Sequence, residues 1–200
     1  YYDCAITLKT HATDWSWCPL FLDINLDGHE DIIVTNGHLR NALNTDTLLK
    51  IEKERTRNKL LTKRQYNKLK EKFEVNNAQN KILINNRNFS FTESSKSMGF
   101  DEMNVSHGIA SGDLDGDGDQ DIIINNANSL CSVYKNNASS PRLLIKLSGK
   151  KSNKFGIGAK ITYVTNSQKY LKEIVCGGRY LSGSESSVTF PYINQKNAYM

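Results

Sequence analysis

The sequence contains no long hydrophobic run. Hydrophobic residues make up 38% of it, but none of its apolar stretches approaches the roughly 20 residues that a membrane-spanning helix requires. The start at Tyr1 shows neither the basic residues nor the apolar run of a signal peptide. We therefore expect no membrane span, and a chain that is mature, trimmed or part of a longer protein.

Closely spaced cysteines are also missing. The four cysteines, Cys4, Cys18, Cys131 and Cys176, form no C-x-x-C pair, which argues against a zinc site. Their wide separation allows two disulfides with three possible pairings if the chain is exported, and buried free thiols are the alternative.

The common catalytic motifs are absent as well. The sequence has no G-x-S-x-G elbow, no Ser-His-Asp spacing and no phosphate-binding G-x-x-x-x-G-K-[ST] loop. For the four histidines, His11, His29, His38 and His107, we expect structural or surface roles. We therefore expect a protein that is not an enzyme.

The positive charge is confined to one segment. Residues 42–75 contain ten Lys and Arg against five Asp and Glu, whereas the rest of the chain contains sixteen of each. Thr45 or Asp46 can cap a helix there, and a break at Thr56-Arg57-Asn58 predicts two helices. Their expected apolar points are Leu48, Leu49, Ile51, Leu60, Leu61, Tyr66, Leu69 and Phe73. A solvated helical face is the preferred interpretation, and contact with nucleic acid or an anionic glycan is the alternative.

Two acidic loops of nine residues stand out from the rest of the sequence. Both place oxygen-bearing side chains at positions 1, 3, 5 and 9 and glycine at position 6, directly before a β-branched run. Hard cations such as Ca²⁺ take six to eight oxygen ligands, and a short loop can supply them. The first predicted site comprises Asp23, Asn25, Asp27, the backbone carbonyl of His29, and Asp31. The second comprises Asp113, Asp115, Asp117, the backbone carbonyl of Asp119, and Asp121.

An EF-hand and an ion-free acidic turn are the competing interpretations of these loops. An EF-hand needs a bidentate Glu at position 12 and a following helix. Position 12 is Val34 or Ile124, and the β-branched residues around it favour a strand. The ion-free turn would leave several carboxylates close together. We therefore predict two structural Ca²⁺ sites.

Strand patterns surround both loops. Ile32–Val34 and Ile122–Ile124 follow them, residues 81–86 and 133–137 end in paired asparagines, and residues 88–93 alternate. From residue 141 the pattern changes to the short strands 143–147, 160–164, 170–175 and 187–190. We expect two β units over 1–140, with a helical insertion at about 42–75, and a small all-β domain over 141–200.

With their flanks, Trp15–Phe21 and Thr35–His38, the loops resemble the FG-GAP/VCBS repeat. The region containing Gly156–Ile161 and Gly178–Ser182 is similar to the ASPIC/UnbV domain. The resemblance implies a mainly β fold in which the loops bind Ca²⁺ between strands of β-propeller blades. Because propellers close with four to eight blades, two units form only a partial propeller, and Tyr1 to Thr10 is a candidate last strand of another blade.

The resemblance implies a secreted or cell-surface binding, adhesion or assembly module. Its expected partners are a protein or glycan ligand, or further copies that pair through open blade edges; we expect no nucleic-acid partner. Two alternatives remain: a polysaccharide lyase using Arg179 or Tyr180, and a filament subunit. Trp15, Trp17 and Tyr180 are candidates for stacking on sugars, although we expect Trp17 to seal the space between blades.

Overall fold

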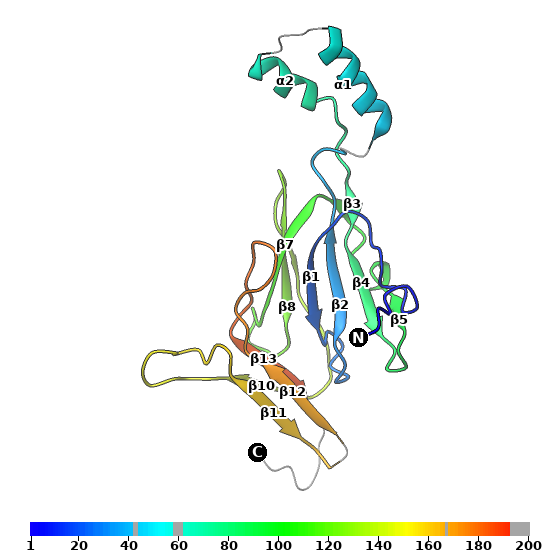
Figure 1. Cartoon of the computed structure of the whole chain (residues 1–200). Helices are drawn as coiled ribbons and strands as arrows, with labels where there is room; N and C mark the ends of the chain where they lie inside the picture. Colours follow the sequence, from blue (N-terminus) through cyan, green and yellow to red (C-terminus); the bar gives the residue numbers. More distant parts are fainter. Residues whose placement is uncertain (42–43, 58–61, 167, 193–200) are drawn as a thin grey trace.

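The computed structural model describes residues 1–41, 44–57, 62–166 and 168–192, and it is mainly β (Figure 1). Its elements are β1 (Ser16–Leu22), β2 (Asp31–Asn36), α1 (Thr45–Arg57), α2 (Lys63–Lys70), β3 (Ala78–Gln79), β4 (Lys81–Asn85), β5 (Phe91–Glu93), a 3-10 turn (Lys96–Met98), β6 (Met103–Asn104), β7 (Ser106–Gly112), β8 (Asp121–Asn126), β9 (Ser132–Tyr134), β10 (Arg142–Lys146), β11 (Lys160–Val164), β12 (Lys169–Glu173) and β13 (Ser187–Pro191). None of the described helices is long and apolar enough to cross a bilayer.

Two antiparallel sheets repeat one design. The first has the strand order β1-β2-β4-β5 and the second β7-β8-β9. Leu22 pairs with Asp31 in the first sheet and Gly112 pairs with Asp121 in the second, so the same register recurs 90 residues later. The third strands also correspond, because Ile33 faces Ile82 and Ile123 faces Val133. The pairings Ser16–Asn36 and Ser106–Asn126 show that the asparagines at the ends of β2 and β8 correspond as well.

One hydrophobic core joins the two sheets. It contains Cys18, Leu20, Leu22, Ile24, Ile33, Ile82, Phe100, Ile109, Ile122 and Ile124. Phe100 stacks on Tyr134 with ring centroids 3.9 Å apart, which brings the end of the first unit onto the second sheet. Each buried Ile or Leu contributes about 1.5–3 kcal/mol. The two units therefore stabilise each other.

The predicted helical insertion is present and projects from the β region (Figure 1). The predicted caps were wrong, because the Asn44 side chain, not Thr45 or Asp46, accepts a hydrogen bond from Thr47 N at 3.0 Å. Thr62 and Gln65 form a capping box on α2. Of the expected apolar points, Ile51 and Leu69 are buried whereas Leu48, Leu49 and Tyr66 are exposed. Asn58, Leu60 and Leu61 lie outside the described residues.

The C-terminal region forms two two-stranded sheets, β10-β13 and β11-β12. Tyr163, Ile174, Val188 and Phe190 are its buried core residues. Successive side chains of a strand point to opposite faces, so every second residue of these strands can face this core. The boundary at residue 141 stays a prediction, and the predicted domain's end, residues 193–200, lies outside the described part of the chain.

One further expectation was wrong, and one open alternative held only in part. Residues Tyr1 to Thr10 form turns, with a hydrogen bond from Leu8 N to the Cys4 carbonyl, and no strand. The alternative of buried free thiols holds only for Cys18, because Cys4, Cys131 and Cys176 are free but exposed.

Candidate metal centre

The two acidic loops occupy equivalent places in the two sheets. One connects β1 to β2 and the other connects β7 to β8. Their backbones also correspond, since Leu26 and Gly28 have φ values of 56° and 90° and Gly116 and Gly118 have 80° and 91°. These left-handed conformations favour glycine, and they turn the loop back on itself. The backbones of the two loops therefore follow a similar turn.

The position-9 carboxylates tie each loop to the third strand of its sheet. Asp31 accepts hydrogen bonds from Ile24 N (3.1 Å) and Asn85 N (2.8 Å). Asp121 accepts the equivalent bonds from Leu114 N and Asn136 N, both at 2.8 Å. Burial raises the pKa of Asp31 to about 6, although the two backbone N–H groups oppose this shift.

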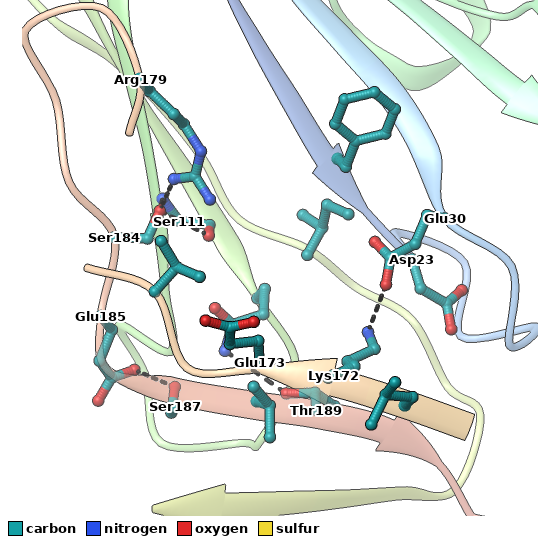
Figure 2. Close-up of a pocket in the computed structure, with 16 residues that line it drawn as sticks. Asp23, Glu30, Ser111, Lys172, Glu173, Arg179, Ser184, Glu185, Ser187 and Thr189 are labelled. Atoms are coloured by element: carbon teal, nitrogen blue, oxygen red, sulfur yellow. Dashed lines mark hydrogen bonds and ion pairs between the residues drawn. The ribbon is translucent and has the colours of Figure 1, made fainter. Parts of the chain in front are cut away.

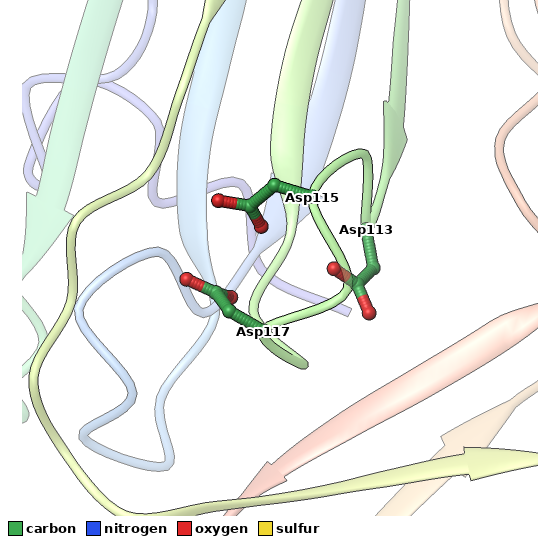
Figure 3. Close-up of side chains that lie close together, drawn as sticks. All are labelled: Asp113, Asp115 and Asp117. Carbon is green, nitrogen blue, oxygen red and sulfur yellow. The ribbon is translucent and has the colours of Figure 1, made fainter.

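The second loop gathers three carboxylates at its open side. Asp113, Asp115 and Asp117 each place an oxygen within 4.8 Å of the others (Figure 3). The Lys135 ammonium lies 2.5 Å from Asp115 Oδ2, and Arg142 Nη2 lies 3.1 Å from Asp117 Oδ1. Hydrogen bonding to Lys135 lowers the pKa of Asp115. Among the described residues, Lys135 and Arg142 thus pair with two of the three clustered carboxylates.

The first loop holds its side chains within the turn. Asp23 accepts hydrogen bonds from Asp27 N (2.9 Å) and Gly28 N (2.8 Å), and Asn25 Oδ1 accepts one from Asp27 N (3.1 Å). Burial raises the pKa of Asp23, against the effect of the Gly28 N–H. Arg87 Nη2 lies 3.1 Å from Asp27 Oδ2. The predicted residues are together here too, but they engage the backbone more than they face one another.

Position 7 differs between the loops. We predicted backbone carbonyl ligands from His29 and Asp119; in addition, the Asp119 side chain is fully buried and lies 3.1 Å from Arg142 Nη1. Neither carboxylate oxygen of Asp119 has a hydrogen-bond partner within the described residues. Burial, followed by the charge of Asp117, raises its pKa to about 6, and Arg142 opposes this shift.

The donor set fits a hard cation. Its side-chain donors are carboxylate and amide oxygens, which suit Ca²⁺ and Mg²⁺ better than a transition metal. Asp31 and Asp121 each retain lone pairs after accepting two N–H bonds.

Sequence reasoning missed the cations around these loops. Arg87, Lys135 and Arg142 each contact a loop aspartate, and Lys172 pairs with Glu30 at 3.0 Å. They come from strands or turns far along the chain, so no local spacing could have identified them. In the described part of residues 42–75, the segment that gave the charge signal, most cations lie on α1 and α2, and these helices project away from the β region (Figure 1).

A cavity of about 350 Å³ lies between the first loop and the C-terminal strands (Figure 2). Asp23, Glu30, Lys172 and Arg179 are among its lining residues. Arg179 donates a hydrogen bond to the Ser184 hydroxyl, and burial lowers its pKa. Tyr180 packs on Trp17 instead, with ring centroids 4.9 Å apart. The two residues considered for lyase chemistry therefore make separate structural contacts.

Trp17 lies between the two repeats. Its ring is 4.6 Å from that of His107 in β7 and 5.7 Å from that of His38 after β2. Its indole N–H donates to the Gly37 carbonyl at 2.6 Å. These contacts join both sheets and the C-terminal region around one ring.

Comparison with known families identifies two segments. Residues 69–124 match the family model described as FG-GAP-like repeat, and residues 149–197 match the one described as ASPIC and UnbV. A search of curated proteins found no match. The first match contains the second acidic loop, and the first loop shares its strand register. FG-GAP-like repeats are typical of extracellular proteins and generally mediate ligand interactions. The chain thus contains an FG-GAP-like repeat followed by an ASPIC/UnbV domain.

Proposed function

We propose that both acidic loops bind Ca²⁺ and that the protein is a non-enzymatic binding, adhesion or assembly module of the cell exterior. The observation that carries this proposal is the duplicated loop geometry. Two loops 90 residues apart share strand register, left-handed positions and position-9 bonds, and the second gathers three carboxylates. One acidic turn arises easily, but two with shared geometry favour a common ligand.

In each loop, some residues would bind the ion and the position-9 aspartate would attach the loop to the third strand. Asp113, Asp115 and Asp117 would hold the ion at the open side of the second loop, while Asp121 fixes the loop to the third strand. Asp23, Asn25 and Asp27 would do the same in the first loop, with Asp31 as the fixed point. The bound ion supplies positive charge that cancels carboxylate repulsion and holds the strands in register.

We further propose that the two sheets are blades of a β-propeller. The first strand of the second sheet, β7, lies against β1 and β2 of the first sheet, and the Thr35 hydroxyl of β2 donates a hydrogen bond to the His107 carbonyl of β7 (2.5 Å). Two blades are fewer than the four to eight of a closed ring. Other blades, in a longer chain or in partner chains, would complete it.

Structural contacts also support a non-enzymatic role. Arg179 is held by Ser184, and Tyr180 packs on Trp17. Release of unsaturated sugars from an acidic polysaccharide by the purified protein would overturn this part of the proposal.

Thermal unfolding in calcium and in chelator tests the metal sites. Extracellular calcium modules bind with Kd values of about 10⁻⁴–10⁻³ M, so about 10 mM calcium would stabilise each site by about 1.4–2.7 kcal/mol. For a chain of this size that raises Tm by about 3–10 °C per site. Asp27→Ala and Asp117→Ala should each remove most of one site's share. Asp101→Ala, an exposed acid outside the loops, should retain the full difference, and equal Tm values for the unmutated protein in both buffers would refute the proposal.

A further inference from the structure

The second sheet has an open edge that the first sheet does not have at the equivalent place. The first sheet continues from β4 to β5, whereas the second ends at β9. The opposite edge, β7, is covered: Ser182, Ser184 and Glu185 accept hydrogen bonds from the N–H groups of Ile109, Ser111 and Asp113 at 3.0–3.3 Å. Within the described residues, the chain therefore protects one edge of this sheet and leaves the other exposed.

Strand alternation identifies the backbone groups on that edge. The N–H groups of Ile109 and Ser111 point away from β8, so their partners Ile124 and Ile122 direct their own backbone groups toward β9. Ile123 lies between them and faces Val133, so the N–H and C=O of Val133 point outward. We define the β9 edge as the outward backbone groups of Val133 and Lys135. In the part of the chain that the structure describes, the Lys135 carbonyl accepts only a long contact from Asn137 Nδ2, at 3.5 Å.

The first sheet shows what occupies the same place when it is filled. Ile82 is the counterpart of Val133, since Ile33 and Ile123 are equivalent. The Ile82 carbonyl accepts a hydrogen bond from Ser94 N, and its N–H donates to the Ser95 hydroxyl, both at 2.9 Å. An antiparallel strand followed by two serines therefore satisfies this edge.

The strand of this chain that could have extended the second sheet beyond β9 pairs with another strand instead. Asn85 and Asn136 are equivalent through their bonds to Asp31 and Asp121. In the sequence, β10 therefore follows Asn136 as β5 follows Asn85 in the first unit. However, β10 pairs with β13 along its whole length, from Arg142–Pro191 to Lys146–Ser187. Arg142 is also held by Asp117 and Asp119. The strand that would cover β9 is thus committed to the C-terminal domain.

A hollow with a mixed lining lies beside the open edge. It measures about 540 Å³, and the apolar side chains of Met103, Leu130 and Val133 line it together with polar residues such as Glu102, Asn104 and Ser129. The side chains of Met103, Leu130 and Val133 are 60%, 89% and 57% exposed. An added strand would place alternate side chains over this surface, where they would cover these three exposed apolar side chains.

We propose that the β9 edge binds an extended segment of another polypeptide, added antiparallel as a fourth strand with β5-like chemistry. Such a segment carries apolar residues that cover the hollow and a hydroxyl that accepts the Val133 N–H. The proposal does not depend on calcium, so it stands or falls separately from the metal sites.

A labelled peptide with the sequence of residues 89–98 is the probe. We expect it to bind the unmutated protein in fluorescence anisotropy, and a scrambled peptide not to bind. Val133→Pro removes the outward N–H, which an edge strand tolerates, and should weaken binding by about tenfold, the value of one hydrogen bond. Val133→Thr, which keeps the N–H, should bind as the unmutated protein does.

Cysteine alkylation supplies a readout that needs no variant. Bound peptide should slow alkylation of Cys131, which lines the hollow, and leave Cys176 unaffected; both are exposed in the free protein. Failure of the peptide to bind or to protect Cys131 would overturn the proposal. Protection of Cys131 that depends on protein concentration without peptide would assign the edge to a second copy and would also overturn it.

Discussion

Asp121 offers the sharpest test of how the acidic loops are built into the sheets. Its side chain is 1% exposed and accepts hydrogen bonds from Leu114 N and Asn136 N at 2.8 Å. Asp121→Ala would leave both N–H groups without that partner, and each loss costs about 1–3 kcal/mol. Because both groups are only partly buried, we expect a loss of about 2–4 kcal/mol in the free energy of unfolding.

Urea unfolding in chelator measures this loss without any contribution from metal. The midpoint should fall at unchanged slope, and Tm should fall by about 5–15 °C for a chain of this length. Asp115→Ala is the matched control, because Asp115 belongs to the same loop but its ion pair is with the exposed Lys135. Such surface pairs contribute little, so in chelator this variant should unfold as the unmutated protein does. Equal stability of Asp121→Ala and Asp115→Ala in chelator would refute the structural role of position 9.

Two further predictions concern contacts that join the parts of the chain. Arg142→Met removes the cation beside buried Asp119 and should lower the free energy of unfolding by about 3–5 kcal/mol, measured by urea titration; an unchanged midpoint would show that this pair does not hold the C-terminal domain to the loop. Gly37→Ala places a Cβ 2.6 Å from the Asn104 carbonyl oxygen at a φ of +112°, whereas Gly99→Ala at +78° meets nothing within 4 Å. Both substitutions carry the cost of a left-handed alanine, about 1–2 kcal/mol, so Gly37→Ala should melt clearly lower than Gly99→Ala, and equal Tm values would contradict the close approach.

The strands that follow the acidic loops were predictable from local pattern. Ile32–Val34 and Ile122–Ile124 are β-branched runs, and they lie in β2 and β8. The alternation in 160–164 and 187–190 likewise predicted β11 and β13. The two-helix insertion followed from the break after α1. In each case neighbouring residues carry the signal, because backbone geometry fixes the period of side chains along an element.

The helix cap and the N-terminal strand were not predictable in the same way. Asn44, Thr45 and Asp46 are all good capping residues, and only the observed bond from Thr47 N selects Asn44. A strand at Tyr1 to Thr10 would need a neighbouring strand to pair with. In the structure this segment closes on itself through bonds such as Thr10 N to the Ala5 carbonyl.

The sequence alone determined the type and order of the chain's β units and the oxygen-rich chemistry of its two loops, because spacing within nine residues decides which side chains one turn can bring together. Tertiary structure decided what surrounds those loops. It brought Arg142 from β10 onto Asp117 and Asp119, covered β7 with Ser182 to Glu185, and, within the described residues, left β9 without a strand on its outer side. These contacts join residues that are tens of positions apart, and only the packing of the two sheets against the C-terminal domain brings them within bonding distance.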